Sequence, residues 1–242
     1  QPDLIAKGRA LKGKVDAVTI PDCGYARPHP SALAMAAMLE REGMETVMHM
    51  TCRDRSRIML QSDAMGAAAL AVKNILCLTG DFPTLGDHPE TKPVFDLDSI
   101  LLISMLREMV DNQTYASGRE LEQGPKLFLG GAIAPFAPPY DFRPHRLGKK
   151  VAAGVDFVIA QQIFDMDRFA EFMRQVVDLG LHEKVYIFGS VGALSGPERA
   201  YWNIENIPGV TIPEAVIKRL EGTPKKRQRE EGIQISVEMI QQ

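Results

Sequence analysis

Six short apolar segments that alternate with helix-like segments constrain the fold of this chain most strongly. The apolar segments cover residues 16–20, 46–52, 74–78, 126–133, 157–164 and 185–188. They are almost continuously apolar, as expected for parallel strands that are covered on both faces. The segments between them carry apolar residues at helical spacing and cover residues 31–42, 57–69, 100–112, 143–153 and 167–179. This alternation predicts βαβ units around a parallel sheet.

The length of 242 residues favours a (β/α)8 barrel of the TIM type over a doubly wound sheet. No G-x-G-x-x-G motif follows the first strand, which is unlike a dinucleotide-binding Rossmann domain. A closed barrel needs two more strands than the six segments provide, and only helical segments follow residues 210–213. We therefore predict one barrel domain over residues 1–242 that lacks its first and last strands and is incomplete at both ends.

Composition indicates an ordinary globular protein with no affinity for nucleic acid. The net charge is −3 and the isoelectric point is about 6.0, so no basic surface is expected. No apolar run is long enough for a membrane span. The three cysteines have no metal-ligand spacing, so we expect no metal site and a reducing, cytoplasmic environment. No signal peptide is visible, although the chain begins at Gln1 rather than at Met.

Small and polar residues gather at the predicted carboxyl ends of the strands, where barrel enzymes carry their chemistry. The carboxylate of Asp81 can accept two N–H bonds from a flat heterocycle, and Gln161 can donate and accept beside it. Gly80 allows a planar ligand to approach the backbone closely. Such groups suit a pterin or a flavin ring, although any barrel has polar strand ends.

Five sequence motifs make the chain resemble a known family. Residues 74–81 read NILCLTGD, 49–52 read HMTC, 156–165 read DFVIAQQIFD, 150–154 read KVAAG and 210–213 read VTIP. In this order they are similar to the L-x-G-D, H-L-T-C, D-F-x-x-T-Q-x-x-F-D, K-x-x-A-G and V-x-I-P motifs of the methylenetetrahydrofolate reductase family. The matches cover nearly the whole chain.

The resemblance implies an oxidoreductase that interconverts 5,10-methylenetetrahydrofolate and 5-methyltetrahydrofolate with NAD(P)H as co-substrate, through a bound flavin. It implies that Asp81 and Gln161 bind the tetrahydrofolate derivative, and that Gln161 also contacts nicotinamide. It further implies that a flavin is lined by the following residues: Thr19, His49, Gly80, Asp81 and Lys150. FAD is the expected flavin, while FMN or direct hydride transfer without a flavin stays open. A homo-oligomer or a partner subunit is also compatible with the sequence.

Three departures from the family leave alternatives open. The glutamate that protonates the folate has no counterpart and is expected upstream of Gln1. Thr79 stands where many members have arginine, and residues 134–139 lack the tyrosine and histidine that hold the adenine side of the flavin. The alternatives are a pterin-binding methyl-transfer barrel and a non-catalytic barrel subunit of a one-carbon complex.

Each candidate residue also has a purely structural interpretation. Asp81 can cap the following element, and His49 can be a core histidine. Gln161 and Thr19 can be buried hydrogen-bonding groups, and Lys150 can be a solvated helix lysine. Asp22 can act as a substitute acid, although we favour a loop cap.

Overall fold

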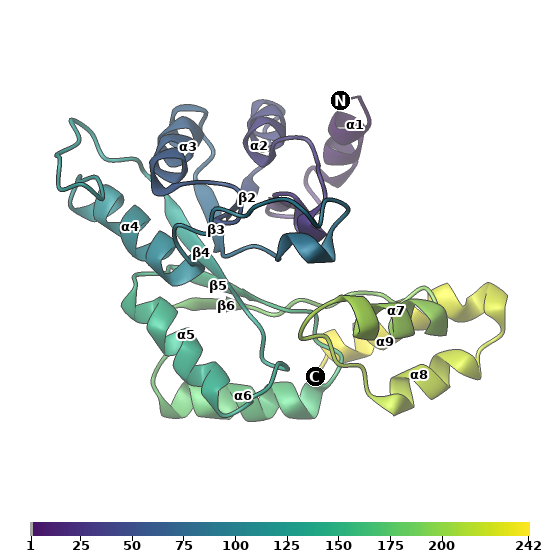
Figure 1. Cartoon of the computed structure of the whole chain (residues 1–242). Coiled ribbons are helices and arrows are strands. Elements are labelled where there is room, and N and C mark those ends of the chain that lie inside the picture. Colours follow the sequence, from purple (N-terminus) through teal and green to yellow (C-terminus); the bar gives the residue numbers. More distant parts are fainter. Residues whose placement is uncertain (1) are drawn as a thin grey trace. The chain divides into compact units, whose positions relative to one another are not determined.

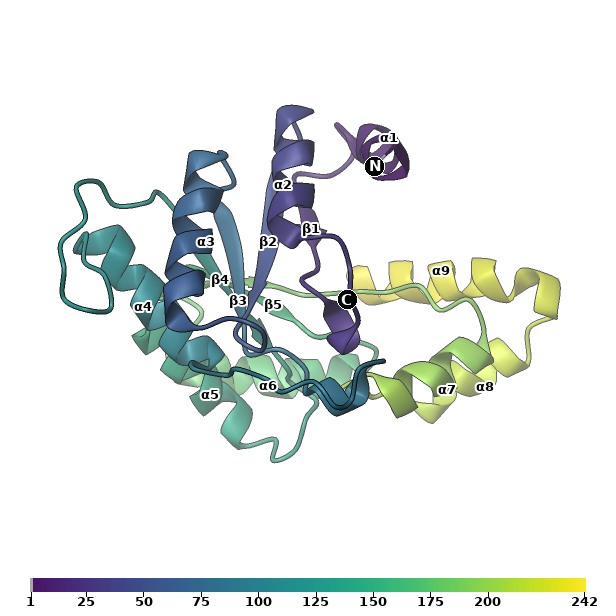
Figure 2. The ribbon, with the colours of Figure 1, turned by 45° about the horizontal axis from the view of Figure 1, so that its top comes forward.

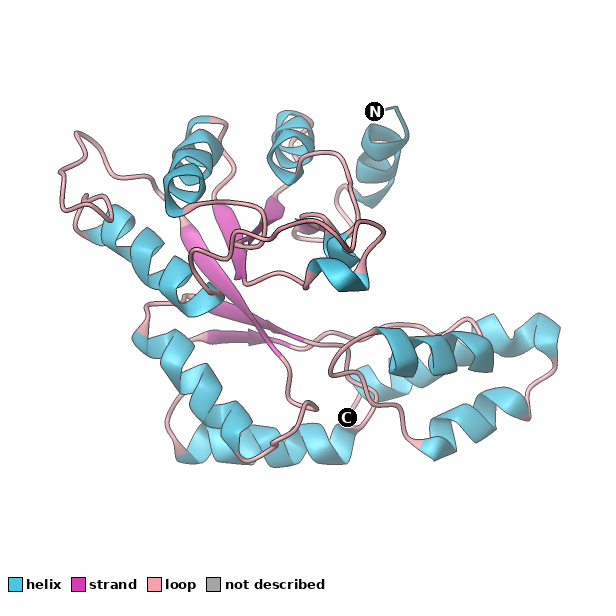
Figure 3. Cartoon of the chain, viewed as in Figure 1, coloured by secondary structure: helices cyan, strands magenta, loops and turns pink. Residues whose placement is uncertain are grey.

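The computed structural model describes residues 2–242, and it has six strands in one sheet (Figures 1 and 3). The strands follow the chain order β1 to β6 across the sheet, and the first three pairs are parallel. Their bounds are β1 Val18–Ile20, β2 Thr46–Thr51, β3 Asn74–Leu78, β4 Phe128–Ile133, β5 Phe157–Ala160 and β6 Tyr186–Phe188. An α/β fold with sequential βαβ units is confirmed, whereas a closed eight-stranded barrel is not among the described residues.

Helices separate the strands, as the sequence predicts. Their bounds are α1 Pro2–Leu11, α2 Ala32–Arg41, α3 Arg57–Ala69, α4 Ser99–Asp111, α5 Phe142–Ala152, α6 Met166–Asp178, α7 Pro197–Asn206, α8 Glu214–Glu221 and α9 Gln228–Ile240. Three short 3-10 turns are η1 Gly24–Ala26, η2 Pro83–Leu85 and η3 Lys225–Arg227. The predicted strand at 74–78 and helix at 57–69 match to the residue, while the sequence analysis made no prediction for α1.

Local sequence explains why α2 begins and ends where it does. The Ser31 hydroxyl accepts the Ala34 N–H at 3.4 Å and caps the first turn. Gly43, with φ +74°, follows the last turn in a conformation that favours glycine. In Figure 2, α2 and α3 lie side by side along β2 and β3. Helix α2 contacts β2, in which Met48 and Met50 are buried.

The chain divides into two compact units. Unit 1 comprises residues 1–131 and 152–157, and unit 2 comprises residues 132–151 and 158–242. The division passes through β4 and β5, so the expectation of one domain stays a prediction. The core of unit 2 is a cluster that includes Phe164, Leu194, Val210, Leu220 and Ile235. None of the helices in residues 2–242 is both long and apolar enough to cross a membrane.

Candidate functional site

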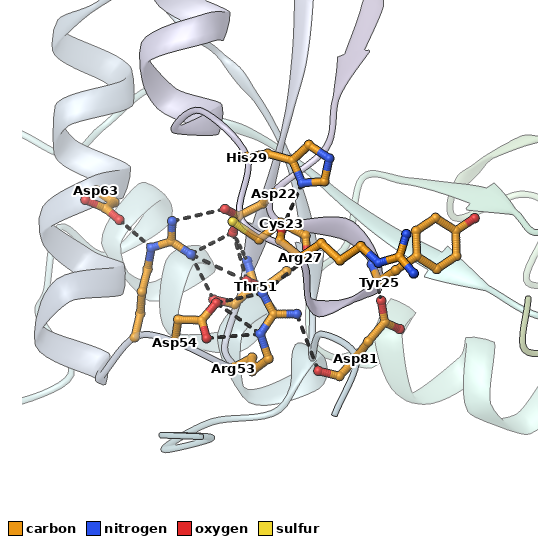
Figure 4. Close-up of polar contacts among 11 residues, drawn as sticks. Asp22, Cys23, Tyr25, Arg27, His29, Thr51, Arg53, Asp54, Asp63 and Asp81 are labelled. Carbon is orange, nitrogen blue, oxygen red and sulfur yellow. Dashed lines mark hydrogen bonds and ion pairs between the residues drawn. The ribbon is translucent and has the colours of Figure 1, made fainter. Parts of the chain in front are cut away.

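The first three strands of unit 1 end in charged residues that form two neighbouring hydrogen-bonded groups, one around Arg55 and one around Arg53 (Figure 4). Asp22 follows β1, Arg53 follows β2, and Asp81 follows β3. The carboxyl ends of parallel neighbours meet at the same edge of a sheet, which brings these three loops together. We call this set, with Thr51, Asp54, Arg55 and Asp63, the strand-end network.

Asp22 ties the first loop of the network to the end of β2. It is 5% exposed, and its Oδ2 accepts the Thr51 N–H at 2.9 Å and the Thr51 hydroxyl at 2.8 Å. The Arg55 guanidinium binds both carboxylate oxygens, at 2.6 and 3.2 Å. Burial raises the pKa of Asp22, but Arg55 and Thr51 outweigh burial and hold the pKa below its usual range. Asp22 is therefore ionised at neutral pH and does not fit the alternative role of a substitute acid.

Arg53 connects all three loops from a buried position. Arg53 is 3% exposed, and its guanidinium binds the Asp54 carboxylate, with Nη2 donating to Oδ2 at 2.7 Å. The same guanidinium donates to the Cys23 carbonyl at 3.2 Å and to the Asp81 carbonyl at 3.4 Å. Next to it, Arg55 donates from Nε to Asp63 at 2.8 Å. Two adjacent arginines thus organise the strand ends.

The Asp81 side chain is held from one side only. Its Oδ2 accepts the Tyr25 N–H at 2.9 Å, and no residue in the described chain donates to its Oδ1. Asp81 does not cap the next element, because Phe82 occupies the cap position of η2 and Asp98 caps α4. The capping interpretation is therefore wrong for Asp81. One carboxylate oxygen remains able to accept a hydrogen bond.

Gly80 places the turn of Asp81 directly against the end of β2. Its φ is +97°, which few other residues adopt. A Cβ added at Gly80 would lie 3.0 Å from the Arg53 Cβ and 3.2 Å from the Thr51 Cβ. The preceding residue, Thr79, accepts the Ser99 N–H at 3.0 Å through its hydroxyl. Glycine therefore permits close packing here, and Thr79 has a structural role at the start of α4.

The turn that faces Asp81 has a strained backbone. Cys23, Tyr25 and Ala26 have φ values of 47°, 56° and 52°, which cost free energy in residues other than glycine. Asp81 holds the Tyr25 amide and Arg53 holds the Cys23 carbonyl, so the network maintains this conformation. A pocket of about 190 Å³ adjoins the turn; its lining includes Cys23, Arg27, Arg53 and His88.

His49 and Thr19 lie on one face of the sheet within unit 1. Thr19 pairs with Val47 in the parallel ladder, and His49 follows two residues later on the same face. The Nε2 atom of His49 is buried and has no hydrogen-bond partner among the described residues. Burial lowers the pKa of His49 to about 4, against the opposing charge of Asp22. His49 is therefore a neutral imidazole with one unused nitrogen.

Gln161 and Lys150 belong to unit 2. The Gln161 amide donates to the Pro208 carbonyl at 3.4 Å and accepts the Gln162 N–H at 3.0 Å. Lys150 lies in the last turn of α5 and is 4% exposed, so it is not a solvated lysine. Asp81 and Gln161 are in different units, and their joint contact with a ligand stays a prediction. The same holds for the flavin roles of Thr19, His49, Gly80 and Lys150.

The sequence analysis did not identify Arg53 or Arg55. Both follow immediately after the HMTC motif, in the sequence RDR at residues 53–55. The signal available in the sequence for a charged site was this group of two arginines and an aspartate directly after a buried strand. Within residues 2–242, no three His, Cys, Asp or Glu side chains gather closely enough to hold a metal ion.

Comparison with known proteins identifies relatives across the chain. A family model described as Methylenetetrahydrofolate reductase matches residues 7–242. A probable methylenetetrahydrofolate reductase (NADPH) from Caenorhabditis elegans is 27% identical over 195 residues, which is 79% of this chain and 26% of that protein. A 5,10-methylenetetrahydrofolate reductase from Salmonella typhimurium is 24% identical over 204 residues, 83% of this chain and 62% of that protein. A third relative, from Pectobacterium carotovorum, is 27% identical over 60% of this chain and 43% of its own length. This chain thus spans between about a quarter and three fifths of these relatives.

Two solved structures are similar in fold. An uncharacterized protein from Clostridium thermocellum that binds two copies of 5-methyl-5,6,7,8-tetrahydrofolic acid has a TM-score of 0.65 at 10% identity. The similarity covers 99% of this chain and 75% of that one. A 2,3-dimethylmalate lyase has a TM-score of 0.50 at 11% identity and covers 97% of this chain and 90% of that one. At these identities the two similarities concern the fold alone.

Proposed function

Because this chain belongs to the methylenetetrahydrofolate reductase family, we propose that it binds a reduced folate for hydride transfer with NAD(P)H. The reaction would interconvert 5,10-methylenetetrahydrofolate and 5-methyltetrahydrofolate. The observation that supports this most is the Asp81 carboxylate, which is anchored through one oxygen and leaves the other as an acceptor. In the same proposal, the six strands are part of a (β/α)8 barrel domain in a cytoplasmic enzyme.

The chemistry of Asp81 matches the edge of a pterin. That edge carries a ring N–H and an amino group side by side, and both donate hydrogen bonds. A carboxylate accepts such a pair more strongly than a neutral group does. Since the Tyr25 N–H occupies one side of Oδ2, we expect Oδ1 of Asp81 to accept the stronger bond from the ligand. Gln161 would contact the folate and then the nicotinamide.

Three residues of unit 1, together with Lys150 of unit 2, are also proposed to bind a flavin. The neutral His49 has a buried nitrogen without a partner, and a polar edge of a flavin would satisfy it. Thr19, Gly80 and Lys150 complete the proposed set, with Lys150 as a phosphate ligand. A bound flavin would supply the hydride-carrying chemistry, while these residues bind and orient it. We expect FAD; FMN and transfer without flavin are distinguished by the absorption spectrum and cofactor content of the purified protein.

The direct test replaces Asp81 by asparagine. We expect the Asp81→Asn variant to bind 5-methyltetrahydrofolate about tenfold more weakly, because an amide cannot accept from both donors of the pterin edge. Its free energy of unfolding should change by about 1 kcal/mol or less. Calorimetric titration and urea unfolding measure the two effects, with Asp111→Asn as a control on the exposed side of α4. Lost stability with unchanged affinity would contradict the proposal.

A pterin-binding methyl-transfer barrel is the second candidate. The similar fold of a protein that binds 5-methyltetrahydrofolic acid supports it, because that compound is a methyl donor. NAD(P)H-dependent turnover of methylenetetrahydrofolate by the purified protein would exclude this alternative. Methyl transfer to a corrinoid acceptor without such turnover would favour it.

A further inference from the structure

We propose that Arg53 is a positioning residue that fixes the Asp81 carboxylate for the pterin edge. This inference rests on the proposed folate-binding function. Arg53 itself is not expected to contact the folate, because its side chain is 4% exposed and its guanidinium is already bound to three partners. Its effect would be transmitted through Asp81.

The contacts of Arg53 form a closed ring with those of Asp81. Arg53 donates to the carbonyl of Cys23 and to the carbonyl of Asp81. The Tyr25 N–H, two residues after Cys23, donates to the Asp81 carboxylate at 2.9 Å. Arg53 therefore holds the backbone of both the donor turn and the acceptor turn, and the carboxylate is fixed between them.

Only arginine can make this arrangement. Its planar guanidinium has five N–H donors in a fixed geometry, whereas lysine offers a single ammonium. Asp54 binds the Nε and Nη2 side of the guanidinium and directs the remaining donors toward Cys23 and Asp81. The Asp54 side chain is 43% exposed, so solvent stabilises it if Arg53 is removed.

Two features indicate that the position of the Asp81 carboxylate depends on the hydrogen bonds of Arg53. The turn at Cys23 and Tyr25 has left-handed backbone conformations that relax when they are not held in place. Gly80 has no Cβ, and a Cβ there would lie 3.0 Å from the Arg53 Cβ. The backbone beside Asp81 is therefore packed directly onto Arg53, which keeps the Asp81 carbonyl within reach of the guanidinium.

The experiment compares Arg53→Met and Arg53→Lys with Arg107→Met. Arg107 is a matched control in unit 1, because it also donates to a backbone carbonyl, that of Gly154, and pairs with Asp156. The first readout is amide hydrogen exchange at Tyr25 in the absence of ligand. The second is the Kd for 5-methyltetrahydrofolate measured by calorimetry.

For Arg53→Met we expect about tenfold faster exchange at the Tyr25 amide and an about tenfold higher Kd. The Thr51 amide, which donates to Asp22, is the internal reference and should keep its exchange rate. Arg53→Lys retains the charge beside Asp54 and should give intermediate values. Arg107→Met should change neither readout, even where it lowers the melting temperature.

Unchanged Tyr25 exchange and Kd in Arg53→Met would overturn the proposal. Equal effects of Arg53→Met and Arg107→Met on Kd would also overturn it, because they would indicate a general loss of stability. If the wild-type protein does not bind 5-methyltetrahydrofolate, the proposed function fails; Tyr25 exchange then still decides whether Arg53 fixes Asp81. If Arg53→Met does not fold, Tyr25 exchange and the Kd are both measured on Arg53→Lys.

Discussion

The buried carboxylates and guanidiniums at the strand ends of unit 1 are charged and paired, whereas several buried polar groups in unit 2 are neutral and unpaired. In unit 1 the buried Asp22 has Arg55 and Thr51 as partners, and Arg53 has Asp54. In unit 2, buried oxygen atoms without a partner among the described residues belong to Gln162, Asn203 and Thr211. Buried polar side chains therefore have hydrogen-bond partners in the strand-end network of unit 1 and lack them at these three positions of unit 2.

This difference separates a rigid region from an adaptable one. A fully paired buried network has one preferred geometry, because each displaced group leaves another charge unsatisfied. A buried oxygen without a hydrogen-bond partner already carries a desolvation cost of about 1–3 kcal/mol. No hydrogen bond stabilises such an oxygen in its present position. We infer that the strand-end network of unit 1 has one preferred geometry, whereas the unpaired groups of unit 2 are able to adopt other partners.

The largest expected effect is on the buried ion pair of unit 1. Asp22→Asn should lower the free energy of unfolding by about 3 kcal/mol, because Arg55 loses a buried partner. In unit 2 the comparable change, Arg219→Gln, breaks the exposed pairs with Glu231 and Glu238 and should cost within about 1 kcal/mol. Urea unfolding of both variants measures the contrast. Equal losses would break the distinction between the units.

The same ion pair gives a pH dependence with a defined sign. The pKa of Asp22 is lower in the folded protein than in the unfolded chain, so its pairing stabilises the fold above the usual pKa. That stabilisation is lost as the pH falls below about 4 toward the folded-state pKa. The difference in stability between the wild type and Asp22→Asn should therefore shrink in that range.

A smaller effect comes from one substitution made in both units. Thr51→Val removes a hydroxyl that donates to Asp22 and should destabilise the protein by about 1–2 kcal/mol. Thr211→Val removes a buried hydroxyl without a partner and should be neutral or stabilising by about 1 kcal/mol. Thermal unfolding of the two variants provides the measurement. Destabilisation of similar size in both would show that Thr211 has a partner.

A separate effect, on the pH dependence of stability, concerns the unpaired histidine of unit 1. Because the folded-state pKa of His49 is about 4 and its ordinary value is 6.5, the unfolded chain binds a proton first as the pH falls. Stability should therefore fall between pH 6.5 and about 4 in the wild type, and this slope should be weaker in His49→Gln. Urea unfolding across that range measures it. An imidazole of His49 that titrates near 6.5 by NMR would contradict buried neutrality.

Hydrophobic periodicity was sufficient to predict most of the fold. The strand at 74–78 is strongly apolar, the helix at 57–69 is rich in alanine and other helix-forming residues, and both match the structure. The predicted strand over 157–164 ends at Ala160, although the Gln161 and Ile163 amides still donate to the carbonyls of Ile133 and Ser190. Sequence could not indicate the two compact units, since the division falls inside two strands.

The site was less accessible to prediction, because its connections are long-range. The position of Asp81 after a buried strand was readable, but its bond to the Tyr25 amide spans 56 residues and involves a backbone group. The roles of Arg53 and Arg55 depend on which carboxylates the fold brings near them. The neighbouring residues in the sequence do not indicate which carboxylates these are. Thr79 illustrates the same point, because its hydroxyl serves the start of α4.

The most direct measurement is a crystal structure of the protein with 5-methyltetrahydrofolate bound. We predict that the amino group and ring N–H of the pterin lie within hydrogen-bonding distance of the Asp81 carboxylate, with Tyr25 still donating to Oδ2. A pterin bound at another place, or an Asp81 side chain turned into solvent in the complex, would contradict the assignment.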